Sequence, residues 1–184
     1  MSRYAFTPPF DKGAASADSR PMAVVDLLEL PGALSADAPV FGLDLGEKTI
    51  GVAASDRSLT IASPLQLIRK TQFTRDAEAL FALMAGRGAE GLVIGLPVNM
   101  DGTEGPRCQS ARAFARNLLR LRELPIAFWD ERLSSAAVNR VLIDEGDASR
   151  ARRGQVVDKI AAAWILQGAL DRLRAAAANP TTTL

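Results

Sequence analysis

The sequence predicts an α/β fold in which a five-stranded mixed sheet is flanked by helices. Short apolar runs of strand length alternate with longer segments whose apolar residues recur at helical spacing. The first two runs are close enough to form an antiparallel hairpin around Gly46. A strand, a helix and a strand then follow in order, and this order implies a right-handed crossover with parallel pairing.

The elements can be assigned one by one. Strands are expected at residues 40–44, 50–54, 61–68, 91–96 and 126–129, and helices at 74–85, 107–121, 134–144 and 156–176. Pro64 favours an edge position for the third strand. Thr74 and Asp76 are expected to open the first helix, Gly86 and Gly88 to close it, and Ser134 to cap the third.

The 184 residues predict one domain. We expect residues 1–38 to be a flexible extension, because they are rich in Pro, Ala, Ser and Asp. An apolar island within it, residues 22–30, is expected to add a small surface helix. Residues 39–176 should form the folded domain, with a mobile basic loop at 145–155, and residues 177–184 a flexible tail.

Composition excludes several classes of function. The net charge of +1 gives no global attraction to nucleic acid or membrane. Cys108 is the single cysteine, so no internal disulfide forms, which suits a reducing cytosol. No apolar run reaches the roughly 18 residues of a membrane span, and the first residues do not resemble a signal peptide. We therefore expect a cytoplasmic protein without a membrane partner.

The chain contains no histidine, which excludes Ser-His and Cys-His catalysis and His-containing zinc sites. Oxygen ligands remain, and these suit Mg²⁺ or Mn²⁺.

Carboxylates stand where strands end. Asp44, Asp130 and Glu131 follow apolar strands, and Asp158 lies in the first turn of the last helix. Each has an ordinary explanation in turn formation or in the helix dipole. The carboxyl ends of parallel strands meet at one edge of a sheet, however, so these acids should gather there. Two carboxylates about 4 Å apart repel by about 4 kcal/mol at an effective dielectric near 20, and a divalent cation removes that conflict.

Two details remain open from the sequence. Side chains alternate along a strand, so Asp130 and Glu131 should start towards opposite faces, and only one of them is expected to enter the site unless the strand has already ended. Arg112, Arg116 and Arg120 recur every fourth residue, which fits either a solvated helix face or a track for a phosphate backbone.

Four ordered motifs carry a family resemblance: GLDLGEKTIGVAASD, GLPVNMDGTEGP, WDERLS and VDKIAAAWILQ. Together they resemble the YqgF family of pre-16S rRNA nucleases, which is similar to RuvC-type Holliday junction resolvases. The resemblance implies an RNase H-like fold, a cytoplasmic location and divalent-metal cleavage that matures the 5′ end of the small-subunit rRNA. It implies catalytic and metal-binding roles for Asp44, Asp130, Glu131 and Asp158. Polar contacts to substrate are expected from Lys48, Asn99, Arg132, Arg150, Arg152 and Arg153.

Other interpretations stay open. The same site could cleave branched DNA as a Holliday junction resolvase, or the fold could bind RNA or DNA without cleaving it. Actin-like ATPases and sugar kinases share a similar Asp-x-Gly hairpin, but they need two such domains, which 184 residues cannot hold. The chain could act as a monomer or a homodimer.

Overall fold

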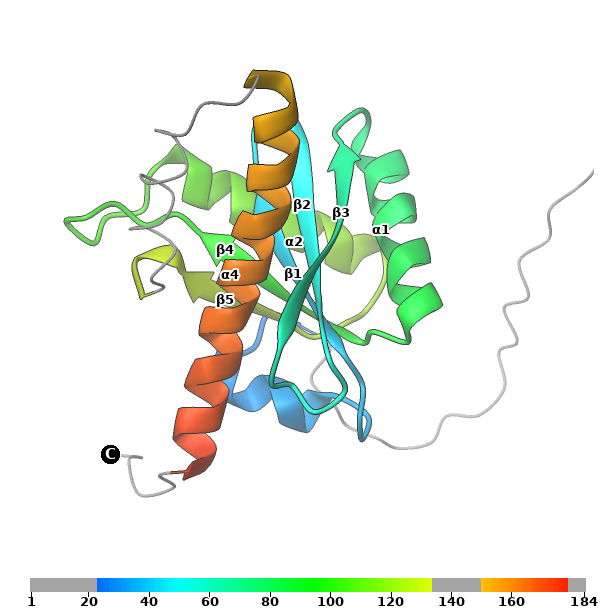
Figure 1. Cartoon of the computed structure of the whole chain (residues 1–184), viewed down its shortest axis with the longest axis vertical. Helices are drawn as coiled ribbons and strands as arrows, with labels where there is room; N and C mark the ends of the chain where they lie inside the picture. Colours follow the sequence, from blue (N-terminus) through cyan, green and yellow to red (C-terminus); the bar gives the residue numbers. More distant parts are fainter. Residues whose placement is uncertain (1–22, 134–149, 179–184) are drawn as a thin grey trace, which may run out of the picture.

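The computed structural model describes residues 23–133 and 150–178, with backbone alone for residues 150–158. Its centre is a five-stranded sheet in the order β3-β2-β1-β4-β5 (Figure 1). The strands are β1 (Val40–Leu45), β2 (Thr49–Ser55), β3 (Ala62–Arg69), β4 (Gly91–Leu96) and β5 (Ile126–Asp130). The β1-β2 and β2-β3 pairs are antiparallel, and the β1-β4 and β4-β5 pairs are parallel. This topology confirms the predicted mixed sheet of RNase H-like type.

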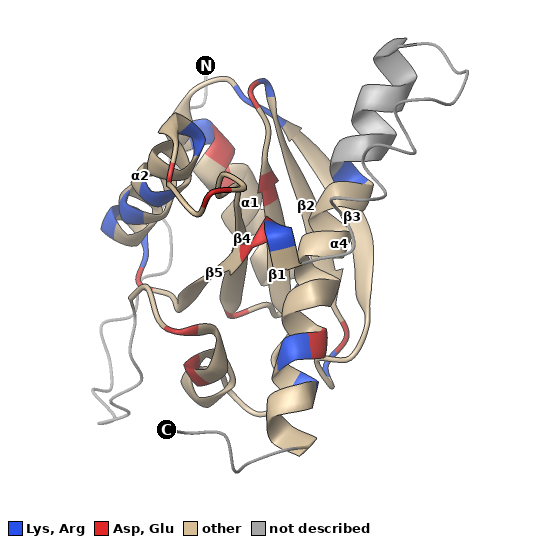
Figure 2. Cartoon of the chain, turned by 90° about the vertical axis from the view of Figure 1, so that its left-hand side faces the viewer, with Lys and Arg blue, Asp and Glu red and all other residues tan. Residues whose placement is uncertain are grey.

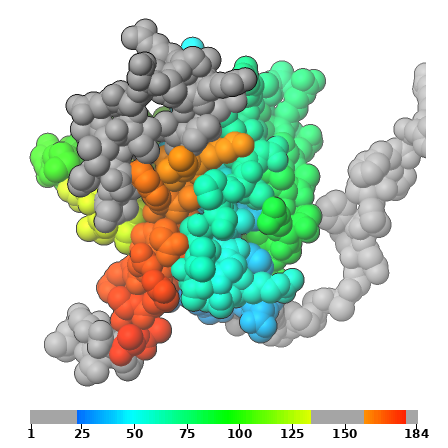
Figure 3. All heavy atoms as spheres, viewed as in Figure 1, coloured from blue at the N-terminus to red at the C-terminus, as the bar shows by residue number. Residues whose placement is uncertain are grey.

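Helices cover both faces of the sheet. α1 (Phe73–Arg87) and α2 (Pro106–Leu121) pack on one face, and α4 (Arg150–Ala178) crosses the other (Figure 1). In the space-filling view α4 forms a ridge beside the β2-β3 region (Figure 3). Two short 3₁₀ helices, η1 (Leu27–Ala33) and η2 (Glu131–Leu133), complete the described elements. The core therefore has two apolar layers, one on each side of the sheet.

The alternation of side chains along β1 decides which layer each residue joins. Phe41 and Leu43 are fully buried in the layer beneath α1 and α2. Val40 belongs to the layer beneath α4, and a Cβ atom added at Gly42 would lie 2.6 Å from the Cβ of Leu166 in α4. Positions 40 and 42 thus face α4, and Asp44 follows them on the same face.

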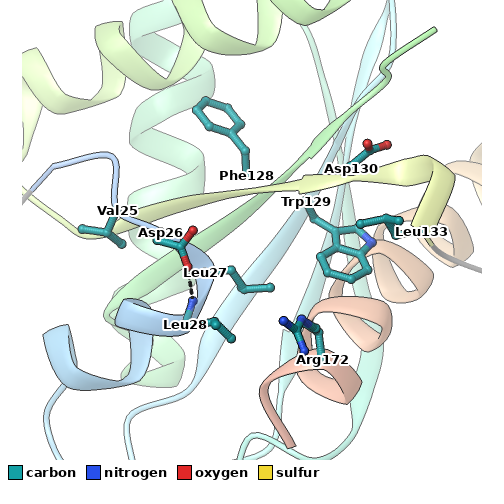
Figure 4. A pocket seen from close by; sticks show the side chains of 9 residues that line it. All are labelled: Val25, Asp26, Leu27, Leu28, Phe128, Trp129, Asp130, Leu133 and Arg172. Carbon is teal, nitrogen blue, oxygen red and sulfur yellow. Dashed lines mark hydrogen bonds between the residues drawn. The ribbon is translucent and has the colours of Figure 1, made fainter. Parts of the chain in front are cut away.

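The segment before the sheet is packed rather than flexible. Leu27 and Leu30 of η1 are buried in the α4 layer, and the Asp26 carboxylate accepts the Leu28 N–H at 2.8 Å (Figure 4). Val24 forms a parallel bridge with Ile126. The folded part of the chain thus begins before residue 39, because the expected island buries its leucines at helical spacing. Residues 1–22 and 179–184 lie outside the described chain.

The last helix is longer than predicted. α4 begins at Arg150 and not at residue 156, so residues 150–155 are helical and their assignment to a mobile loop is wrong. One glycine inside a helix, here Gly154, costs only about 1 kcal/mol, and its arginine, alanine and glutamine neighbours favour helix. The predicted helix at 134–144 lies outside the described residues.

The start of the first helix also differs from the prediction. The N-cap residue is Gln72, and its side chain makes no capping bond. Asp76 is buried and accepts hydrogen bonds from the Thr71 N–H at 3.1 Å and the Thr71 hydroxyl at 3.0 Å. The C-cap is Gly88, with φ of 66°, as the sequence predicted.

Candidate active site

Asp44 is buried at the carboxyl end of β1, with 6% of its surface exposed. It is the fifth of the six residues of the strand, and its position in the alternation turns it towards α4. Burying a charged carboxylate raises the free energy of the folded protein unless other groups stabilise its charge. This cost separates Asp44 from an ordinary surface turn residue.

Glu131 reaches the same face from the far side of β4. A Cβ atom added at Gly95 would lie 2.7 Å from Oε1 of Glu131 and 2.6 Å from Cδ1 of Ile165 in α4. The β1-β4 ladder pairs Leu43 with Ile94, so the next positions along it are Asp44 and Gly95. Neighbouring strands lie about 4.8 Å apart, so the Asp44 and Glu131 carboxylates occupy adjacent places beneath α4.

Asp130 lies on the opposite face of the sheet. In Figure 4 its carboxylate and the Phe128 ring stand on one side of β5, and Trp129 stands on the other. Arg132 binds Asp130 through Nη2 at 2.7 Å, through Nε at 3.1 Å and through its backbone N–H at 3.0 Å. These bonds lower the pKa of Asp130, and the bonds from the Arg132 side chain have the largest effect. Of the two neighbouring acids, Glu131 therefore lies on the Asp44 side, while Asp130 holds Arg132.

The part of α4 that contains Asp158 lies towards the carboxyl end of β1. The helix runs antiparallel to β1, with Leu166 and Ala162 over Gly42 and later residues towards the start of the strand (Figure 1). Asp158 precedes Ala162 by one turn, on the same helical face and nearer the carboxyl end of β1. Its side chain lies outside the described residues, as do those of Arg150, Arg152 and Arg153.

The loop between β4 and α2 is held by its own hydrogen bonds. Asn99 Nδ2 donates to the Thr103 hydroxyl at 2.9 Å, and Asp101 Oδ1 accepts the Thr103 N–H at 2.9 Å. The Thr103 bonds lower the pKa of Asp101. Arg132 Nη1 donates to the Asn99 carbonyl oxygen at 3.3 Å, which joins this loop to Asp130. Asn99 and Asp101 thus shape the rim of the site.

A basic group closes the β1-β2 turn. The Lys70 ammonium donates to the Gly46 carbonyl oxygen, and the Lys70 N–H donates to the Lys48 carbonyl oxygen at 2.9 Å. Burial lowers the pKa of Lys70, and the nearby charge of Arg107 lowers it further. The charges of Asp76 and Asp44 raise the pKa of Lys70. Lys48, the predicted phosphate contact, is exposed in the same turn.

The arginine stripe on α2 divides into two kinds of residue. Arg112 forms an ion pair with Glu104, with Nε 2.8 Å from Oε2, and its guanidinium lies 4.9 Å from the centre of the Phe128 ring. Arg116 and Arg120 are exposed. Figure 2 shows basic residues, in blue, along α2. The pairing of Arg112 favours the solvated face over a continuous phosphate track.

The donor set is compatible with a hard divalent cation. Asp44 and Glu131 supply carboxylate oxygens, the ligand type that Mg²⁺ and Mn²⁺ prefer. Within residues 23–133 and 150–178, no three acidic or cysteine side chains are grouped closely enough to hold a metal.

Sequence reasoning missed Gly95, Lys70 and Arg107. A glycine inside an apolar strand such as GLVIGL marks a close approach of other atoms, and that signal could have identified Gly95. Arg107 lies in the first turn of α2, where the helix dipole disfavours a cation, so its position was also informative.

The sheet order and the two carboxylates beneath α4 define an α/β protein of RNase H-like type with an acidic centre at the carboxyl ends of its parallel strands. The chain belongs to the RuvX family, described as "Holliday junction resolvase", whose profile matches residues 38–172. The family predicted from the four motifs is thereby confirmed.

Individual relatives agree over most of the chain. A protein of Phenylobacterium zucineum (strain HLK1) named "Putative pre-16S rRNA nuclease" is 73% identical over 83% of this chain and 99% of its own length. One of Caulobacter vibrioides (strain NA1000 / CB15N) with the same name is 68% identical over the same shares. A solved structure, "T. thermophilus RuvC in complex with Holliday junction substrate", has a TM-score of 0.46 and 11% identity, covering 74% of this chain and 96% of that one. No helix in the described part of the chain is long and apolar enough to cross a membrane.

Proposed function

We propose that the protein is a divalent-metal-dependent nuclease that hydrolyses a phosphodiester bond near the 5′ end of the 16S rRNA precursor. The observation that carries the proposal is the convergence of Asp44 and Glu131 beneath α4. The names of the relatives support the substrate, which in turn implies a cytoplasmic location.

Asp44, Glu131 and Asp158 would hold Mg²⁺ or Mn²⁺. Such an ion activates the attacking water and offsets charge on the phosphate and the leaving oxygen. In this scheme Glu131 is the metal ligand of the Asp-Glu pair, because its carboxylate lies on the Asp44 face. Asp130 would instead orient Arg132 through the bond at 2.7 Å, and the Arg132 guanidinium would meet a substrate phosphate together with Lys48. Arg150, Arg152 and Arg153 add positive charge at the start of α4.

Site variants test this assignment. Asp44→Asn and Glu131→Gln should each lower the cleavage rate by more than the roughly 10- to 100-fold typical of residues that only support a metal ligand. Asp130→Asn should stay within that range, because it removes a partner of Arg132 and not a ligand. The assay uses a precursor RNA with an extended 5′ leader, in Mg²⁺, in Mn²⁺ and in EDTA. Unchanged cleavage by Asp44→Asn would refute the site, and a larger loss for Asp130→Asn than for Glu131→Gln would reverse the roles of the two acids.

Branched DNA is the second candidate substrate, favoured by the description of the family as Holliday junction resolvase. The same enzyme preparation should be offered a four-way DNA junction in parallel with the precursor RNA. Symmetric, metal-dependent cuts in the junction with intact RNA would assign resolvase activity. Binding to either substrate without any metal-dependent product would indicate a binding module instead.

A further inference from the structure

A pocket of about 340 Å³ lies between the β1-β2 turn and the start of α2. Its floor is formed by Leu45, Gly46 and Phe114, and its polar groups come from Lys70, Arg107 and Ser110. Glu47, the acid among the lining residues, is exposed and can turn to solvent. A pocket of this size accommodates one charged group together with the atoms attached to it.

Two cations face this pocket, and neither forms an ion pair within the described part of the chain. The Asp76 and Asp44 carboxylates act on Lys70 from a distance and raise its pKa. Among the described residues the Lys70 ammonium donates to the Gly46 carbonyl oxygen alone, so two of its three N–H groups can meet a ligand. The Arg107 guanidinium makes no hydrogen bond or ion pair within the described part of the chain. Arg107 also stands in the first turn of α2, which contains no acidic residue. Two cations at the positive end of a helix destabilise each other, and an anion relieves that repulsion.

The pocket is adjacent to the proposed catalytic acids. Leu45 directly follows Asp44, and their side chains point to opposite faces of the sheet. The acids thus lie on the α4 side of the end of β1, and the pocket lies on the α2 side. A nucleic-acid strand that crosses this edge of the sheet would reach both.

We propose that this pocket binds a backbone phosphate of the nucleic acid, one or two nucleotides from the phosphate that is cleaved. Lys70 and Arg107 contact its oxygens, and the Arg107 N–H is available as a further donor. The Ser110 hydroxyl lines the pocket but already donates to the Pro106 carbonyl oxygen at 3.0 Å. The contact fixes the strand relative to Asp44 and reads no base. This inference rests on the proposed function, since it takes a phosphodiester as the substrate.

Arg107→Gln is the primary test because it breaks no hydrogen bond or ion pair within the described part of the chain. Binding of the precursor RNA is measured by fluorescence anisotropy in EDTA over a series of salt concentrations, which separates binding from cleavage. We expect a several-fold higher Kd and a salt slope reduced by about 0.7, the value for one phosphate contact on a single strand. Arg87→Gln, an exposed arginine at the opposite end of the fold, is the matched control and should change neither quantity.

A second measurement locates the phosphate. RNAs in which a single backbone phosphate is replaced by a neutral methylphosphonate should lose affinity for the wild-type protein at one position near the cleavage site. For Arg107→Gln the same replacement should have little further effect, because the contact is already absent. Lys70→Gln should show the same insensitivity, with thermal unfolding confirming that the β1-β2 turn persists.

Two results would overturn the proposal. The wild-type protein could bind and cleave the RNA while Arg107→Gln and Arg87→Gln show identical Kd values and salt slopes. This result would refute the phosphate pocket and leave the proposed nuclease function standing. A wild-type protein that neither binds nor cleaves the RNA or the DNA junction would remove both.

Discussion

At Gly95 the absence of a side chain determines where Glu131 can lie. On the face of β4 that packs against α4, Glu131 Oε1 and Ile165 Cδ1 would both lie within 3 Å of a Cβ atom added at Gly95. The carboxylate is thus held against the strand by packing from α4 as well as by its own place in η2. Small residues of this kind position catalytic groups without contacting substrate.

Gly95→Ala should therefore impair cleavage more than stability. The new methyl group displaces the flexible Glu131 side chain and presses on Ile165, with an expected cost of about 1 to 3 kcal/mol in the free energy of unfolding. Cleavage should fall by at least about tenfold as Glu131 moves from Asp44. Gly86→Ala is the control, since it has no atom within 4 Å and should stabilise α1 by about 0.5 to 1 kcal/mol. Full activity of Gly95→Ala would show that Glu131 does not need this position.

The sequence predicted the acid of β1 well because a buried strand rarely carries charge. The alternation of side chains along a strand also predicted that Asp130 and Glu131 would point to opposite faces of the sheet. It did not predict which of the two would face Asp44. That outcome depends on the turn that η2 makes after β5 and on the contact with Gly95, which joins residues far apart in the sequence. The Lys70 and Arg107 pair has the same origin, since the two residues meet only once β3 and α2 are in place.

At the scale of elements, the β2-β3 turn is organised by one carboxylate. Asp56 accepts the N–H groups of Ile61 at 2.9 Å and Thr60 at 2.7 Å, and also the hydroxyl groups of Ser58 and Thr60. The Ile61 bond, followed by those of Ser58 and Thr60, holds the pKa of Asp56 far below its usual range. Gln167 of α4 then bonds the chain at Thr60 and Ala62, with distances of 3.0 and 2.8 Å. The turn is thereby tied to the helix that carries Asp158.

Asp56→Ala should lower the free energy of unfolding by about 1 kcal/mol at pH 7, because several donors lose a charged acceptor. The folded-state pKa is depressed, so this stabilisation is present above the unfolded value near 4 and is lost as the pH falls towards the lower folded value. Urea unfolding of both proteins at pH 7 and at pH 3 measures the difference. The gap between wild type and variant should narrow at pH 3, and a gap that widens there would contradict the assignment.

At the scale of the whole molecule, the chain ahead of the sheet belongs to the core. The alternation and helix rules predicted the sheet and its layers, because those patterns are local. They placed residues 23–38 in an extension, because a short apolar island has no local signal for the partner it will cover. Leu30 is fully buried and would lie 3.3 Å from a Cβ atom added at Gly91, so it packs over the start of β4.

Leu30→Ala should cost about 2 to 5 kcal/mol in the free energy of unfolding, the usual range for removing a buried leucine side chain. Leu28→Ala is the matched control in the same short helix, because Leu28 is 46% exposed and should cost much less. Denaturant titration of both variants provides the measurement. Equally small losses of unfolding free energy for the two variants would indicate that residues 23–38 are a dispensable extension.

The two outer strands differ from the open edges of many sheets. β3 contains Pro64, which has no N–H to donate, and its pairing with β2 shifts register between Val52 and Ala53. On the other side, Ala23 and Val25 bond to Ile126 of β5 at 3.0 and 2.9 Å. Neither border offers a long, regular template to an incoming extended peptide, so crowded copies of this chain should resist fibril growth.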